Sequence, residues 1–269
     1  MRFGGRVYKI EDLKIIGSLG LDFAEISLLE GGTMIYQTQD LLREAEKWGF
    51  TYLVHAPREE DPCDLNRLAG GYFQEILGLF KACRKLSCPL LNIHFWMDSR
   101  FIPEKILDRK REILFAMARE GLRKGVQLCL ENLSERPEDF QSLLSECPEL
   151  GLTLDIGHAQ LYSQKNHCVE FLELWPKRVK HVHAHDNLGG EGLEYDVHLP
   201  IGQGVIDFLS IMRAFVESGY QKTITLEVPL DHLESSVRQL KQIVDSLKRN
   251  LLKISIPKEI TYEKCRNDC

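Results

Sequence analysis

Short apolar runs rich in β-branched and aromatic residues alternate with longer amphipathic segments from the first residues to about residue 250. Runs of this length, bounded by turn-forming residues, are typical of buried strands, and the segments between them have helical periodicity. Alternating strands and helices indicate βα units and a parallel sheet. The predicted strands cover residues 2–5, 23–27, 52–55, 90–95, 127–131, 152–155, 179–183 and 223–227.

Eight βα units within roughly 250 residues have the size of a single (β/α)8 TIM barrel, and this α/β fold is our prediction. A doubly wound open sheet is the alternative. It suits the strand count less well, and no GxGxxG motif follows the first strand. We expect the barrel to span residues 1–253. Residues 254–269 lose the periodicity and are predicted to form a C-terminal surface extension, which carries two cysteines of unknown role.

The composition indicates a globular chain: 269 residues, 43% hydrophobic and 28% charged. The formal charge of −6 argues weakly against a protein that mainly binds long polyanions. No apolar run is long enough to span a membrane, the first ten residues lack the features of a signal peptide, and the eight cysteines are scattered without a CxxC pair. We therefore expect a cytoplasmic protein with reduced thiols and no membrane partner. The sequence does not indicate an oligomeric state.

Residue types that bind metals recur where the predicted strands end. In a barrel these ends meet at one face, where catalytic groups lie. One such residue is weak support, but six successive strands that end in His, Asp or Glu are hard to assign to packing, because buried charges are costly unless paired or bound to metal. The predicted ligands are His55, His94, Glu131, Asp155, His158, His183 and Glu227, with Asp196 and His198 in the loop after the seventh strand.

We expect one to three divalent ions. Nine ligands exceed the needs of one tetrahedral ion and suit two or three. Mixed imidazole and carboxylate ligands favour zinc, manganese or iron, and no cysteine is among them. His181, His183 and His185 share one strand face; His181 is predicted to be a core histidine. His185, Asn132 and Trp96 are candidates for contact with substrate. Asn132 is also a candidate for orienting a ligand, and a plain strand-terminating role is an equal alternative for it.

The motifs around these residues resemble the xylose isomerase-like barrel superfamily, which includes endonuclease IV (AP endonuclease family 2) and the sugar phosphate isomerases and epimerases. The resemblance covers nearly the whole chain and rests on VHAP, NIHF, LEN, DIGH, HVHAHD, DVHLPIGQG and LEV, which contain the predicted ligands. In the endonuclease IV branch the nine matching positions hold three zinc ions. The isomerase branch needs one ion, whose ligands match Glu131, Asp155, His183 and Glu227.

The resemblance implies two chemistries. As an isomerase or epimerase of a sugar or sugar phosphate, the protein would use Glu131 and Glu227 to move a proton through a metal-stabilised enediolate. As an endonuclease IV-like phosphodiesterase acting on abasic DNA, it would use several ions to activate water. The extra ligands favour the second chemistry. The net charge, and the acidic loops at 56–67 and 186–195, disfavour nucleic acid and make the first our prediction.

A small phosphorylated or acidic sugar would reconcile the extra ligands with the acidic loops. A third hypothesis, from another class, is a metal-binding barrel without catalytic activity. It leaves the charged cluster without a role.

Overall fold

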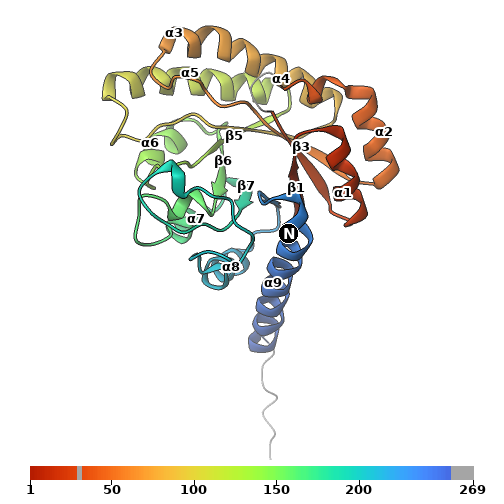
Figure 1. Ribbon diagram of the computed structural model, residues 1–269. Coiled ribbons are helices and arrows are strands. Elements are labelled where there is room, and N and C mark those ends of the chain that lie inside the picture. Colours follow the sequence, from red (N-terminus) through yellow and green to blue (C-terminus); the bar gives the residue numbers. More distant parts are fainter. Residues whose placement is uncertain (29–31, 256–269) are drawn as a thin grey trace, which may run out of the picture.

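The computed structural model describes residues 1–28 and 32–255, and within them eight parallel strands close into a barrel (Figure 1). The strands follow chain order, and β1 pairs with β8 to close the ring. The open-sheet alternative is therefore wrong. The strands are β1 (Arg2–Val7), β2 (Phe23–Ser27), β3 (Thr51–His55), β4 (Leu90–Ile93), β5 (Gln127–Glu131), β6 (Gly151–Asp155), β7 (Val179–Ala184) and β8 (Thr223–Leu226).

Each predicted strand is present, with ends within two residues of the prediction. β4 ends at Ile93 and β8 at Leu226, so His94 and Glu227 begin the loops that follow these strands. Both residues still lie at the carboxyl ends of the strands. The small shifts therefore leave the predicted site in place.

Helices surround the barrel (Figure 1). They are α1 (Leu13–Ser18), α2 (Thr38–Trp48), the single turn α3 (Leu65–Arg67), α4 (Phe73–Lys85), α5 (Glu104–Arg123), α6 (Asp139–Glu146), α7 (Cys168–Leu174), α8 (Phe208–Glu217) and α9 (Leu233–Ser255). The long helix α9 runs two residues past the predicted boundary at 253. The rest of the predicted extension lies outside the described residues. Among the described helices, none is long and apolar enough to cross a membrane.

The interior of the barrel changes from apolar to polar along its axis. Phe23, Leu53, Leu90 and Cys129 form a small apolar cluster near the beginning of their strands. The Phe23 ring occupies the space where a side chain on Gly4 would lie, so only glycine fits at that position of β1. Further along the strands, buried polar side chains replace the apolar ones. The apolar end supplies packing, and the polar end forms the site.

Candidate metal centre

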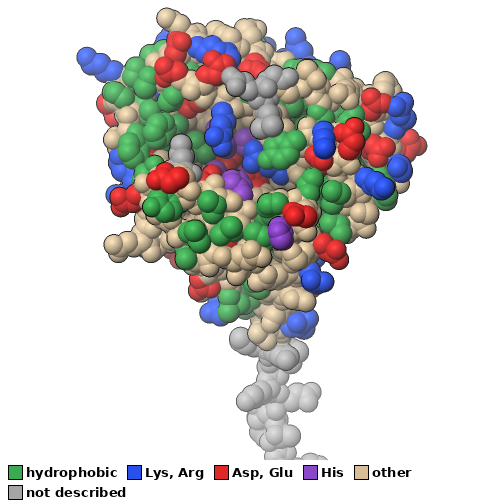
Figure 2. All heavy atoms as spheres, viewed as in Figure 1, with side chains coloured by type: hydrophobic (Ala, Val, Ile, Leu, Met, Phe, Trp, Pro, Cys, Tyr) green, Lys and Arg blue, Asp and Glu red, His purple; other side chains and the backbone are tan. Residues whose placement is uncertain are grey.

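All nine predicted ligands lie at the mouth of the barrel, where the strands end. The surface is hollowed there, and histidine and basic side chains are visible in the hollow (Figure 2). Nitrogen and oxygen atoms of these residues and of His185 lie within 4.8 Å of one another in four groups, of which the first three share residues. The groups are His55, His94 and Glu131; Glu131, Asp155 and His183; His55, His183 and Glu227; and His158, His185, Asp196 and His198.

Glu131, at the end of β5, connects the first two groups. Its Oε2 atom lies 3.2 Å from His55 Nε2 and 3.3 Å from both His94 Nε2 and His183 Nδ1. The other oxygen, Oε1, lies 3.2 Å from His158 Nδ1. The carboxylate is fully buried. This carboxylate lies where the first two groups meet and could contribute a ligand to a cation in either of them.

His183, on β7, lies at the middle of the mouth. Its Nδ1 atom is 3.3 Å from Glu131 Oε2, 3.2 Å from Glu227 Oε1 and 3.7 Å from Asp155 Oδ2. Carboxylates from β5 and β6, and from the residue after β8, thus meet at one imidazole nitrogen. This central group contains the four residues that the isomerase branch implied.

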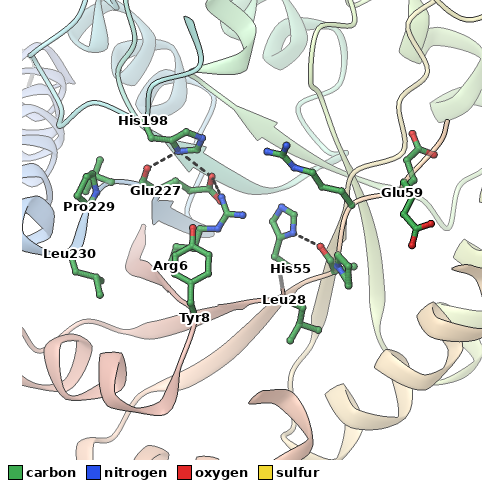
Figure 3. A pocket seen from close by; sticks show the side chains of 14 residues that line it. Arg6, Tyr8, Leu28, His55, Glu59, His198, Glu227, Pro229 and Leu230 are labelled. Carbon is green, nitrogen blue, oxygen red and sulfur yellow. Dashed lines mark hydrogen bonds and ion pairs between the residues drawn. The ribbon is translucent and has the colours of Figure 1, made fainter. Parts of the chain in front are cut away.

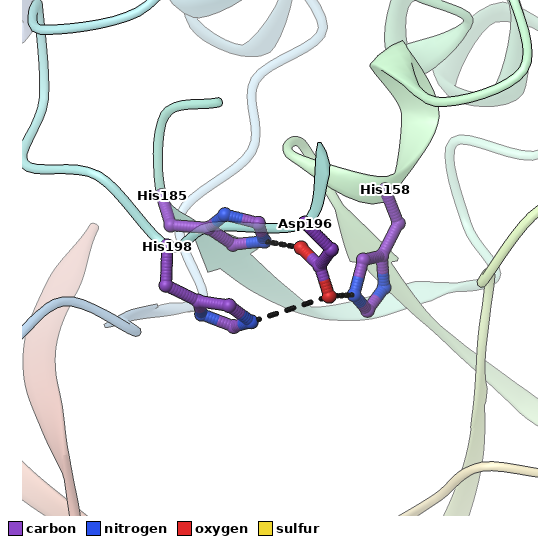
Figure 4. Close-up of side chains that lie close together, drawn as sticks. All are labelled: His158, His185, Asp196 and His198. Atoms are coloured by element: carbon purple, nitrogen blue, oxygen red, sulfur yellow. Dashed lines mark hydrogen bonds and ion pairs between the residues drawn. The ribbon is translucent and has the colours of Figure 1, made fainter. Parts of the chain in front are cut away.

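The fourth group lies to one side of the mouth and combines His158, His185, Asp196 and His198 (Figure 4). Asp196 Oδ2 lies 3.2 Å from His158 Nε2 and 3.4 Å from His198 Nε2. His198 adopts a φ of +47°, a backbone conformation that is costly for residues other than glycine. The loop after β7 therefore holds Asp196 and His198 against His158, which follows β6.

Hydrogen bonds from the outer ring nitrogens orient three of these histidines. His55 Nδ1 donates to the Ala56 carbonyl at 2.8 Å, His158 Nδ1 to the Asn132 carbonyl at 3.0 Å, and His198 Nδ1 to the Glu227 carbonyl at 2.8 Å. Each bond uses a proton on Nδ1, so Nε2 is the ring nitrogen that faces the mouth and could bind a metal ion. Histidines that bind metals have this arrangement.

The mouth fits divalent metal ions. Within the described part of the chain, six buried nitrogen and oxygen atoms of these groups have no hydrogen-bond partner: Glu131 Oε1, Asp155 Oδ2, His183 Nδ1, His185 Nε2, Asp196 Oδ1 and Glu227 Oε1. A buried polar atom without a partner costs folding free energy. The cost is larger when several carboxylates and imidazoles with such atoms lie close together. Divalent cations would satisfy these atoms, so the buried His, Glu and Asp clusters are consistent with divalent metal binding.

The charges in the mouth shift the pKa of its groups strongly. Burial alone would raise the pKa of Glu131, but His183 and His94 outweigh it and hold the pKa well below its ordinary value. Burial lowers the pKa of His94 to about 4, so that ring is neutral at physiological pH. Burial also opposes protonation of His183, yet Glu227, Glu25 and Glu131 together raise its pKa well above the ordinary value.

We expect metal binding to release protons and to tighten as pH rises. Without metal, the raised pKa keeps His183 protonated at pH 7, and a cation must displace that proton to reach Nδ1. For each displaced proton, affinity should rise about tenfold per pH unit below the pKa. Calorimetric titration of metal-free protein with Mn²⁺ in two buffers of different ionisation enthalpy measures the release. Binding at pH 7 without proton release would contradict this expectation.

Glu25, which the sequence prediction missed, supports the centre from below. This fully buried β2 residue accepts from His183 Nε2 at 3.1 Å and His181 Nε2 at 2.9 Å, and also from Thr225. His181 is buried, as predicted. The contact with Glu25 turns His183 Nδ1 toward the mouth and completes a carboxylate–histidine pair behind the proposed ligand. A charged residue inside the apolar run FAEIS was the available sequence signal.

The Glu25→Gln substitution should weaken metal binding by roughly 10- to 100-fold while the chain remains folded. The amide keeps the size of the side chain but loses the charge and one acceptor. Competition between the protein and a chromogenic chelator for Mn²⁺ measures affinity in the folded variant, and circular dichroism verifies the fold. Glu11→Gln, at an exposed position, is the matched control. Equal Mn²⁺ affinities for the two variants would show that Glu25 does not support metal binding.

Two cavities open onto the ligands. The larger, of about 880 Å³, is lined by Arg6, Tyr8, His55, His198 and Glu227 among others (Figure 3). Arg6, on β1, pairs with Glu227 Oε2 at 2.6 Å. This arginine was also missed, because the predicted first strand stopped at Gly5. The smaller cavity, of about 250 Å³, contacts His94, His158 and Asp196, and Arg58 lines both cavities.

The three candidates for substrate contact have different surroundings. Asn132 accepts from Asp155 N at 2.7 Å and donates to the Asp155 carbonyl at 3.1 Å, so its buried side chain links β5 to β6 behind the ligands. His185 is fully buried, with Nε2 at 3.2 Å from Asp155 Oδ1. Trp96 lines the smaller cavity. Among the three, Trp96 has the position most open to a substrate.

The acidic loop after His55 presents less negative charge than its sequence indicated. Glu59 pairs with the buried Lys110 at 2.7 Å, and Glu60 with Arg67 at 3.0 Å. Arg58 extends along the two cavities instead. The structure therefore weakens the argument from this loop against a phosphate-bearing substrate.

The chain belongs to the xylose isomerase-like TIM barrel family, whose sequence profile matches residues 13–250. It is 28% identical to the uncharacterized protein MJ1311 of Methanocaldococcus jannaschii, over 70% of this chain and 67% of that protein. Among solved structures, a D-tagatose 3-epimerase-like protein has a TM-score of 0.82 at 24% identity, covering 93% of this chain and all of that one.

A second solved structure, the TTHB071 protein of Thermus thermophilus soaked with ZnCl2, has a TM-score of 0.73 at 24% identity, covering 91% of this chain and 99% of that one. At these identities the structural likeness shows the fold alone.

Proposed function

We propose that the protein is a divalent-metal-dependent isomerase or epimerase of a phosphorylated or acidic sugar. The observation that carries the proposal is the convergence of Glu131 and Glu227 on His183 Nδ1, at 3.3 and 3.2 Å. Two carboxylates at one buried centre can remove a proton from a carbon and return one. The similarity to a D-tagatose 3-epimerase-like protein is in accord with this chemistry.

The residues of the mouth have separate roles in the proposed reaction. A divalent ion held by Glu131, Asp155, His183 and Glu227 would supply positive charge beside a sugar carbonyl and so ease loss of a proton from the adjacent carbon. One glutamate takes that proton, and the other gives a proton back. Although burial opposes it, Arg6 lowers the pKa of Glu227, so this glutamate is a carboxylate at neutral pH and can receive a proton.

The larger cavity supports an anionic substrate. Arg6 and Arg58 both line it, close to His55, His198 and Glu227. Guanidinium groups match phosphate and carboxylate oxygens in charge and geometry. The His158, Asp196 and His198 group provides a further place for a cation that could bind the same anion. A neutral sugar would not require this group, whereas an anionic sugar would give it the role of holding a cation that binds the anion.

The second candidate function is an endonuclease IV-like phosphodiesterase. The three connected ligand groups favour it, because Glu131 lies between two of them and several ions can hold both the attacking and the leaving oxygen of a phosphate ester. The charge of −6 disfavours a long polyanion as the substrate.

Proton exchange separates the candidates. Mn²⁺- or Zn²⁺-loaded protein is incubated in D2O with ketoses, aldoses and their phosphates, and separately with duplex DNA containing an abasic site. We expect one deuteron to enter a sugar phosphate, seen by NMR, while phosphate stays bound and DNA stays intact. Phosphate release or strand cleavage that depends on Glu131 would overturn the proposal in favour of the hydrolase. Metal binding with no reaction across the panel would favour the non-catalytic barrel.

A further inference from the structure

The smaller cavity is largely apolar and continues directly from the metal centre. Its apolar walls include Trp96, Leu133, Leu161 and Tyr162. Arg58, Glu59 and the predicted ligands His94, His158 and Asp196 also line it. A molecule bound at these ligands can therefore extend into this cavity. Neither proton transfer nor the two arginines of the larger cavity accounts for these apolar walls.

Trp96 is held rigidly in the wall. Its Nε1 atom donates to Ser134 Oγ at 2.8 Å, and Ser134 Oγ in turn donates to Asp98 Oδ2 at 2.7 Å. Phe101 stacks on the indole, with ring centroids 5.3 Å apart and planes inclined by 25°. Because its only polar atom is already bonded, the indole offers the cavity an apolar aromatic surface at little entropic cost.

Tyr162 is placed by a strained backbone. Its φ is +53°, a conformation that disfavours a bulky residue, and its N–H donates to the Gly190 carbonyl at 2.8 Å. Its ring meets Phe101 edge to face at 5.6 Å, and the Arg100 Cζ atom lies 5.7 Å from the ring centroid. A tyrosine at a backbone position that favours glycine points to a role for its ring.

We propose that this cavity binds a planar, uncharged aromatic group of the substrate, which makes the substrate an anionic sugar that carries an aromatic substituent. The inference rests on the proposed function, which places the anionic sugar in the larger cavity. The volume of about 250 Å³ exceeds the roughly 150 Å³ at which an apolar protein cavity already binds benzene. Flat rings stack favourably on indole and phenol surfaces.

Binding of inert phosphonates tests the inference. The Kd values of phenylphosphonate and methylphosphonate for Mn²⁺-loaded protein are measured by calorimetry; the two share the anionic group and differ in the ring. Burial of the ring should make phenylphosphonate bind roughly 10- to 100-fold more tightly. A second pair, uridine 5′-monophosphate and ribose 5-phosphate, shows whether a nucleobase serves as the ring.

The Tyr162→Gly variant removes one wall and relieves the positive φ, so it should fold; its melting temperature verifies this. We expect the ratio of the two phosphonate Kd values to fall toward one in this variant. The matched control, Tyr36→Ala, alters an exposed tyrosine outside both cavities and should keep the ratio. Equal Kd values in the unaltered protein, or an undiminished ratio in Tyr162→Gly, would overturn the inference alone. Failure of both phosphonates to bind would overturn the proposed anion site, and the inference with it.

Discussion

The Glu131→Gln substitution is expected to reduce turnover by roughly 10²- to 10⁴-fold, the usual contribution of a positioned acid or base. The Oε2 atom of Glu131 lies within 3.3 Å of an imidazole nitrogen of each of His55, His94 and His183. The Asn92 side chain donates a hydrogen bond to the same oxygen. The amide loses the charge and one acceptor at the point where two ligand groups meet. Metal content should therefore fall together with activity.

Activity and metal content are measured on the same preparation of the Glu131→Gln variant by deuterium exchange and elemental analysis. Glu138→Gln makes the same chemical change at an exposed position between β5 and α6, and it should keep both properties. A Glu131→Gln variant with full metal content and normal turnover would show that this carboxylate neither binds metal nor transfers the proton.

Removing metal with a chelator should lower the melting temperature by roughly 5–10 °C. A ligand present at 100 times its Kd stabilises the folded state by about 2.7 kcal/mol, and each kcal/mol moves the melting temperature of a chain of this size by about 2–4 °C. The melting temperature should fall because the buried carboxylates of Glu131, Asp155 and Glu227 repel one another when no cation lies between them.

Restoring Mn²⁺ or Zn²⁺ to the chelated protein should restore the higher melting temperature, and Mg²⁺ should restore less because it prefers oxygen ligands. The comparison of chelated and restored protein separates the loss of metal from effects of the chelator itself. A melting temperature that does not respond to chelator or to added metal would contradict a centre that stabilises the fold.

The barrel and most of its mouth were predictable from the sequence, because a local signal marked each part. Buried strands stand out as short apolar runs, and in a parallel barrel their carboxyl ends must meet. A histidine or carboxylate at the end of a predicted strand, such as His55 or Glu131, is thereby placed near the others without knowledge of side-chain conformation. The structure adds the grouping of these residues around His183 and Asp196.

The residues that were missed do not stand at the end of a predicted strand. Arg6 lies on a strand whose end was predicted two residues too early, and Glu25 lies within a strand rather than at its end. Tyr162 follows a short turn, and its position depends on a bond between the β6–α7 and β7–α8 loops. Contacts between loops that are distant in sequence are decided by closure of the whole barrel, which no local pattern records.

The most direct test of the metal centre is an anomalous diffraction map of crystals grown from protein purified without chelator, with data collected at the absorption edge of the bound metal. We predict a peak surrounded by Glu131, Asp155, His183 and Glu227, and further peaks at the His55–His94 and His158–Asp196–His198 groups where these are occupied. A map from protein supplied with Mn²⁺ and Zn²⁺ that has no peak among the first four residues would contradict the account.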